Sequence, residues 1–116
     1  MSERDTQAQT VNVEEARQAI AGDGAVAIDV RDADEWAEGH VPGALHLPEG
    51  ELESRLEDLP KDQRLIVVGE KGDPGTGVAA DLRDRGFDAV AIEGGMEAWK
   101  DEDFTLQPSP DADLSA

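Results

Sequence analysis

The chain has 116 residues, enough for one domain, and it carries 28 acidic against 10 basic residues, a formal net charge of −18. This excess of negative charge repels nucleic acid, so DNA and RNA are excluded as partners. The chain contains no cysteine, which excludes disulfides, thiolate metal sites and catalysis by a cysteine nucleophile of its own.

The acidic residues are spread along the whole chain, and their mutual repulsion destabilises a compact state unless salt screens it. With 3% aromatic residues and few lysines, the composition indicates adaptation to a salt-rich cytoplasm. A basic partner surface is the alternative reason for the acidity. The sequence shows no run of about 18 apolar residues, and the first ten residues have no apolar segment of the kind that a signal peptide needs. We therefore expect a cytoplasmic protein without membrane contact.

Apolar strands alternate with helices over about 90 residues. The predicted elements are a short edge strand at 11–13, a helix from 13 to 21, a strand at 25–30, a helix at 32–38, a strand at 44–47, an amphipathic helix at 52–59, a strand at 65–68, a helix from about 76 to 85, a strand at 87–92 and a helix at 96–101. Such alternation predicts a parallel sheet that helices cover on both faces. The ends, residues 1–10 and 105–116, are predicted to be a disordered leader and tail.

Polar residues mark the start of two of these helices. Asn12 with Glu15 has the spacing of a capping box, and Asp32 stands three residues before Glu35 in the same way. Trp36, like Trp99 near the end of the chain, is expected to anchor its helix or to lie in the core.

The stretch from Arg64 to Ala80 has the local architecture of an active site. An apolar strand passes into a glycine-rich loop and then into a helix, so several backbone N–H groups point at one spot that suits an anion. Ligands of open α/β sheets bind at this place, beyond the carboxyl end of a strand. The loop, however, carries Glu70 and Asp73 against the single Lys71, and it has no cysteine, serine or histidine to act as a nucleophile.

Two motifs resemble the signatures of a known family. The first combines Ile28-Asp29-Val30-Arg31, Glu35-Trp36 and Gly39-His40-Val41-Pro42-Gly43-Ala44, and the second combines Gly86-Phe87-Asp88-Ala89-Val90 with Glu93-Gly94-Gly95-Met96-Glu97-Ala98-Trp99. Both resemble rhodanese-like domains, and the match runs without gaps from about Val11 to Phe104. The resemblance implies a domain at 11–104 with a rhodanese-like three-layer sandwich of the α/β class, in which helices cover both faces of a five-stranded parallel sheet.

The resemblance also implies an active-site loop that begins with cysteine, followed by glycine three residues on, arginine five on and serine or threonine six on. Aligned on Ala79-Ala80 and Leu82, this pattern places Glu70 at the cysteine, Asp73 at the glycine, Gly75 at the arginine and Thr76 at the hydroxyl residue. A slip of one residue places Gly69 at the cysteine and Gly72 at the glycine instead. Neither register supplies a sulfur. The active-site-like loop therefore has no predicted catalytic residue; it consists of Glu70, Lys71, Gly72, Asp73, Pro74, Gly75 and Thr76.

The residues of and around this loop leave two interpretations open in each case. Glu70 either occupies the anion site of the loop and accepts bonds from backbone N–H groups, or it acts as the general base of a weak hydrolase. Lys71 offsets the two carboxylates or binds a ligand. Asp29 and Arg31, at the carboxyl end of a strand, form a structural ion pair or contribute to ligand binding.

The two histidines do not predict a metal site. His40 is expected to be a hydrogen-bonded turn residue, as the resemblance also implies, and together with His46 it supplies too few ligands for zinc. We expect neither a metal nor another cofactor.

The sequence therefore favours a non-catalytic rhodanese-like domain, an inactive homologue in the sulfurtransferase family from a salt-adapted organism. Such a domain would be a monomer that binds a partner protein or acts as a regulatory module. The alternative is sulfur transfer from thiosulfate or a persulfide with a thiol that another protein supplies.

Overall fold

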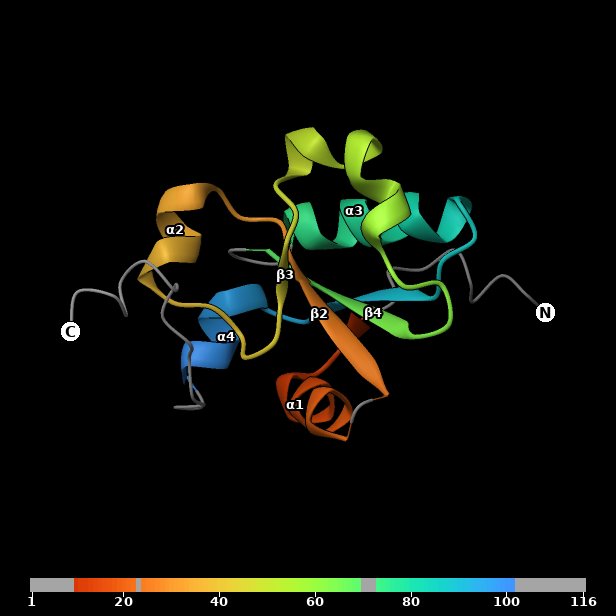
Figure 1. Ribbon diagram of the computed structural model, residues 1–116. Coiled ribbons are helices and arrows are strands. Elements are labelled where there is room, and N and C mark those ends of the chain that lie inside the picture. Colours follow the sequence, from red (N-terminus) through yellow and green to blue (C-terminus); the bar gives the residue numbers. More distant parts are fainter. Residues whose placement is uncertain (1–9, 23, 70–72, 102–116) are drawn as a thin grey trace.

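Five parallel strands form one sheet at the centre of the domain (Figure 1). The computed structural model describes residues 10–22, 24–69 and 73–101. In this part of the chain the strand order is β1-β5-β4-β2-β3. The strands are β1 (Thr10–Val11), β2 (Ala25–Asp29), β3 (Leu45–His46), β4 (Arg64–Val68) and β5 (Ala89–Ile92). The predicted α/β class and the five-stranded parallel sheet are confirmed.

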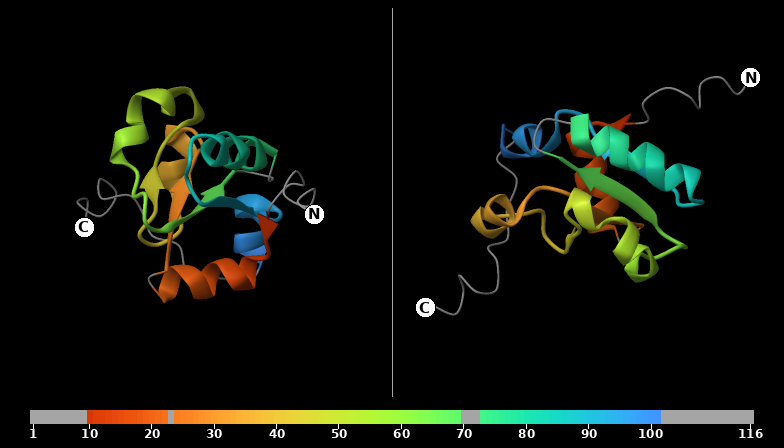
Figure 2. Two further views of the ribbon diagram at one scale, coloured as in Figure 1. Left: turned by 90° about the vertical axis from the view of Figure 1, so that its right-hand side faces the viewer. Right: turned by 90° about the horizontal axis from the view of Figure 1, so that it is seen from above.

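Helical segments cover both faces of this sheet (Figure 2). One face packs against α1 (Val13–Ala21) and α4 (Gly95–Asp101), and the other packs against α3 (Asp73–Asp84) and the 3₁₀ segment η3 (Glu53–Asp58). A shorter 3₁₀ segment, η2 (Glu49–Glu51), precedes η3. The short helix α2 (Ala33–Glu38) has no fully buried residue and projects at the end of the molecule where β2 and β4 finish (Figure 1). None of the described helices is long and apolar enough to cross a membrane.

Alternating side chains along the central strands build two separate cores. In β4, Leu65 and Val67 face α3, whereas Ile66 and Val68 face α1 and α4. All four are at most 1% exposed, and β5 alternates in the same way. A strand that is buried on both faces needs apolar residues at every position, which is why these runs are almost continuously apolar.

The helix caps follow the predicted pattern. Asn12 Oδ1 accepts a bond from the Glu15 N–H at 2.8 Å, and the Asn12 N–H donates to Glu15 Oε1 at 3.1 Å. This capping box begins α1, and Asp32 caps α2 by accepting from the Glu35 N–H at 3.2 Å. Both predicted helix starts are confirmed, because capping depends only on residues that are close in sequence.

The segment predicted as an amphipathic α-helix at 52–59 is 3₁₀ instead. Bonds of the i to i+3 type link the Arg55 N–H to Leu52 O at 3.1 Å and the Leu59 N–H to Leu56 O at 3.2 Å. Leu52 and Leu59 are both buried at the two ends of the segment. The larger rise per residue of a 3₁₀ helix stretches the segment between these two anchors.

Helix α3 begins at Asp73, three residues before the predicted start at Thr76. Aspartate is favourable near a helix N-terminus, and proline loses no hydrogen bond in a first turn, so Asp73 and Pro74 belong to the helix. At its other end, Gly86 has a φ of +97° and the Phe87 N–H donates to Leu82 O at 3.0 Å. Phe87 therefore completes the end of α3, and β5 begins two residues later than predicted.

Smaller corrections concern the chain ends and the third strand. Thr10, which was predicted to belong to the leader, is the first residue of β1, and the third strand is shortened to Leu45–His46. The rest of the predicted leader and the whole predicted tail lie outside the described residues.

Candidate functional site

The carboxyl ends of β2 and β4 define the candidate site. After β2 the chain continues to β3 on one side, and after β4 it continues to β5 on the other side. Asp29 and Val68, the last residues of β2 and β4, lie opposite one another in the sheet. Connections that leave in opposite directions open a crevice between the strand ends, where ligands of open α/β sheets bind.

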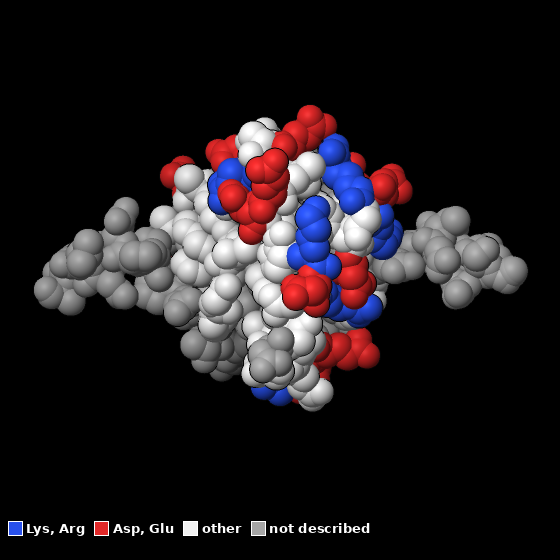
Figure 3. Space-filling view, turned by 45° about the vertical axis from the view of Figure 1, so that its right-hand side comes forward, with Lys and Arg blue, Asp and Glu red and all other residues white. Residues whose placement is uncertain are grey.

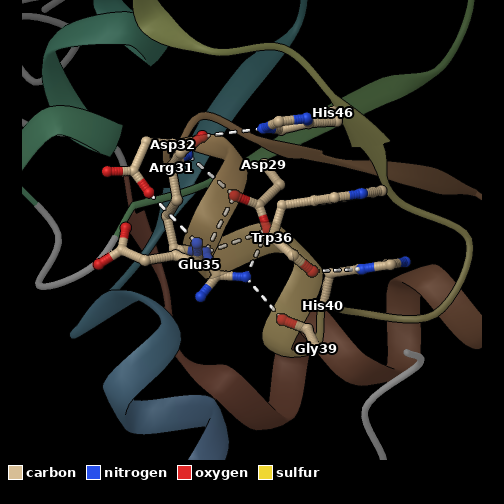
Figure 4. Close-up of polar contacts among 8 residues, drawn as sticks. All are labelled: Asp29, Arg31, Asp32, Glu35, Trp36, Gly39, His40 and His46. Carbon is tan, nitrogen blue, oxygen red and sulfur yellow. Dashed lines mark hydrogen bonds and ion pairs between the residues drawn. The ribbon is translucent and has the colours of Figure 1, made fainter. Parts of the chain in front are cut away.

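A buried ion pair lies at this edge of the sheet (Figure 4). Arg31 Nη2 is 2.9 Å from Asp29 Oδ2, and Arg31 Nε donates to Asp29 Oδ1 at 3.0 Å. The Asp29 side chain is fully buried and that of Arg31 is 2% exposed. Arg31 Nη2 also donates to the Gly39 carbonyl at 2.7 Å, which links the end of β2 to the end of α2. The ion pair that the structural interpretation predicts is present, and it compensates two charges that would be costly to bury alone.

The ring of Trp36 lies between the rings of His40 and His46 (Figure 4). The Trp36 and His40 rings are nearly parallel with centroids 3.5 Å apart, and the Trp36 and His46 centroids are 4.6 Å apart. His40 Nδ1 is 3.1 Å from the Trp36 carbonyl, and His46 Nε2 is 2.9 Å from the Arg31 carbonyl. Because a carbonyl oxygen only accepts, these two ring nitrogens carry protons.

The stack explains the structural roles of Trp36 and His40. His40 is the hydrogen-bonded residue that was predicted, and it is 4% exposed. Trp36 anchors α2 as predicted, although it does so on two imidazole rings and is itself only half-buried. Sequence reasoning missed the stack: the spacing of four residues between Trp36 and His40 is a signal for it, whereas the contribution of His46 depends on β3 lying beside β2.

Both flanks of the active-site-like loop are fixed by backbone contacts. On the strand side, the Met96 N–H donates to the Gly69 carbonyl at 2.7 Å. On the helix side, a Cβ atom added to Gly75 would lie 3.3 Å from the Gly69 nitrogen and 3.4 Å from the Val67 carbonyl oxygen. Glycine at position 75 therefore allows the first turn of α3 to pack closely against the end of β4.

The loop itself is described only in part. Glu70, Lys71 and Gly72 lie outside the described residues, so their predicted roles stay predictions. Gly75 is buried in the first turn of α3, and Thr76 is half-buried beside it. The structure thus brings Asp29, Arg31 and His40 to the same edge of the sheet as both flanks of the loop. Among the residues that the structure describes, no group of three or more His, Asp or Glu residues could hold a metal ion.

The fold and this edge define an open α/β domain in which the two central strands are connected in opposite directions, the arrangement at which ligands of such sheets bind. The chain belongs to the family of rhodanese-like domains, because the model of the rhodanese-like domain matches residues 12–102. A relative in Bacillus subtilis (strain 168), named "Putative sulfurtransferase YtwF", is 39% identical over 75 residues, which cover 65% of this chain and 73% of the relative.

Solved structures of similar proteins agree with this assignment. A rhodanese-related protein from Thermoplasma volcanium has the same fold with a TM-score of 0.81 at 22% identity, covering 87% of this chain and 99% of that one. A rhodanese-like domain protein from Staphylococcus aureus has a TM-score of 0.78 at 28% identity, covering 87% of this chain and 98% of that one.

Proposed function

We propose that this chain is a non-catalytic rhodanese-like domain that binds a partner protein or acts as a regulatory module. The observation that carries the proposal is the absence of cysteine from all 116 residues. The resemblance implies a cysteine that holds the transferred sulfur as a persulfide, and Glu70 stands at its position in the motif. A carboxylate can neither form a persulfide nor be regenerated by passing sulfur on, so the family's reaction lacks its nucleophile.

The electrostatics of the crevice support a non-catalytic role. Asp29 neutralises Arg31, and Arg31 is the only buried Lys or Arg in the described part of the chain. An anionic sulfur donor such as thiosulfate would enter a crevice edge whose positive charge is already compensated. Binding of anions and stabilisation of a thiolate both need an uncompensated cation or free N–H donors.

The acidic surface supports a salt-adapted cytoplasmic protein, and we propose that it functions there as a monomer. Sulfur transfer with a thiol supplied by another protein is the second candidate. The observation that favours it is the relative named as a sulfurtransferase, at 39% identity over 75 residues.

An assay of thiocyanate release from thiosulfate and cyanide separates these two functions. We expect the chain to give the rate of a protein-free blank, both alone and with added dithiothreitol. A rate above the blank without added thiol would refute the non-catalytic role, and a rate above the blank only with the thiol would favour the second candidate.

Substitution Glu70→Cys tests whether sulfur alone is missing. Gain of thiocyanate release in Glu70→Cys, but not in the control Glu57→Cys on the exposed face of η3, would show that the loop still supports a thiolate. No gain would place the defect in the surroundings of residue 70 as well. The activity of the unmodified chain is measured separately by the assay above.

A further inference from the structure

A cleft of about 350 Å³ lies between α3 and the 3₁₀ segments, and its lining residue Gly77 directly follows Thr76 of the active-site-like loop. Its lining comes from two parts of the chain: Gly50, Leu52 and Glu53 on one side, and Gly77, Val78 and Asp81 on the other. The right-hand view of Figure 2 shows these two segments side by side over the same face of the sheet. The volume is in the range of clefts that bind small ligands or single side chains, roughly 300 Å³ and above.

The cleft has an apolar floor and open ends. Leu52 and Val78 belong to the core beneath it and are 7% and 3% exposed. Gly50 and Gly77 are exposed at its rim, and a Cβ atom added to either would meet nothing within 4 Å. The space therefore exists because two rim positions carry no side chain.

Two carboxylates stand at one end of the cleft and already bind one guanidinium. Arg85 Nη2 is 3.0 Å from Glu53 Oε2, and Arg85 Nε is 3.2 Å from Asp81 Oδ1. The bond with Asp81, followed by the bond with Glu53, raises the pKa of Arg85 above its usual value. Among the described residues, Glu53 Oε1 and Asp81 Oδ2 accept no hydrogen bond. Two negative charges thus face one positive charge, and one oxygen of each carboxylate is left for a second donor.

We propose that this cleft is the docking site for an arginine side chain of the partner protein. The aliphatic part of the arginine lies on Leu52 and Val78, and its guanidinium group reaches the unused carboxylate oxygens of Glu53 and Asp81. Acidic side chains also lie beside the basic ones over the face in Figure 3, and the net charge of −18 steers a basic partner toward the domain. The inference rests on the proposed protein-binding function and names the chemistry of the partner.

Nuclear magnetic resonance can test the cleft with defined peptides. The probe is a short, capped peptide with one arginine, compared with the same peptide carrying citrulline, which has nearly the same shape without the charge. We expect the arginine peptide to shift the amide signals of Gly50 and Gly77 and the citrulline peptide to leave them in place. Equal shifts with both peptides, or shifts elsewhere that spare these two glycines, would overturn the proposal. Equal affinity for a lysine peptide would overturn the choice of arginine.

Variants separate the cleft from general attraction to an acidic protein. Asp81→Asn is expected to weaken binding about tenfold, the usual effect of losing one charge-assisted hydrogen bond. The matched control Asp88→Asn removes a carboxylate that also pairs with an arginine, Arg64, at 3.3 Å, and should weaken binding less than twofold. Equal weakening by both variants would mean that only net charge acts. Thermal melts establish that each variant is folded.

Filling the cleft tests its shape without changing charge. Gly77→Leu adds a side chain where the structure has open space, so we expect a folded protein that no longer binds the arginine peptide. Undiminished binding by folded Gly77→Leu would overturn the proposed position of the side chain. These outcomes leave the proposed function untouched, because thiocyanate release tests catalysis independently of the peptide.

Discussion

Replacing Arg31 by methionine should destabilise the domain more than any change to a surface ion pair. Methionine keeps part of the aliphatic volume and removes the guanidinium group. The Asp29 carboxylate would then lie fully buried without its cation, and the Gly39 carbonyl would lose the bond that Arg31 Nη2 donates at 2.7 Å.

Removing one partner of a buried ion pair costs about 3–5 kcal/mol, and the lost bond to Gly39 adds about 1 kcal/mol. A domain of this size has a free energy of unfolding of about 5–15 kcal/mol, so Arg31→Met loses a large part of it. Each kcal/mol of lost stability lowers the melting temperature of a small domain by about 4–8 °C. A loss of about 3 kcal/mol or more should therefore lower it by about 12 °C or more.

Urea unfolding followed by circular dichroism measures this loss. The control is Arg64→Met, because Arg64 pairs with Asp88 at 3.3 Å while both side chains stay largely exposed; its cost should be below about 1 kcal/mol. The double variant Asp29→Asn/Arg31→Met should be more stable than Arg31→Met, since a neutral amide is cheaper to bury than a carboxylate. A loss for Arg31→Met no larger than that for Arg64→Met would refute the reasoning.

Three further predictions concern charge and backbone. The melting temperature should rise from dilute buffer to molar KCl, because the Debye length falls from about 10 Å at 0.1 M to about 3 Å at 1 M; a flat or falling curve would contradict salt adaptation. Gly94→Ala should lower the free energy of unfolding by about 2 kcal/mol or more, since φ is +81° and the new Cβ would lie 2.8 Å from Ala98 Cβ. The control Gly24→Ala places a Cβ that meets nothing within 4 Å, so it should be nearly neutral. Urea unfolding measures both variants. Hydrogen bonds from Arg17 and then Gln18 lower the pKa of Glu14. The contribution of Glu14 to stability is therefore present at neutral pH and lost as acid protonates the carboxylate. The melting temperatures of Glu14→Gln and the unmodified chain should converge in acid, and a difference that persists there would contradict this.

Features that depend on neighbouring residues could be predicted from the sequence. The capping box of Asn12 and Glu15 closes within one helical turn, and the apolar runs of β2, β4 and β5 follow directly from burial on two faces. The parallel order then follows from alternation of strands and helices.

Features that depend on contacts between distant segments could not be predicted. The position of His46 against Trp36 requires β3 to pair with β2, and the cleft joins Gly50 to Gly77 through the packing of η3 on α3. The 3₁₀ geometry of residues 53–58 also follows from where Leu52 and Leu59 meet the sheet, because their spacing alone suits an α-helix equally well.

The sparse attachment of α2 has a consequence for how the domain opens. No residue of α2 is fully buried, and the contacts that hold it include the rings of His40 and His46 on Trp36 and the Arg31 bond to Gly39. Detaching this helix exposes almost none of the two apolar cores, so it requires far less free energy than global unfolding. Its amide protons should exchange with solvent long before those of β4, and the crevice end of the domain can rearrange around a bound protein while the sheet stays intact.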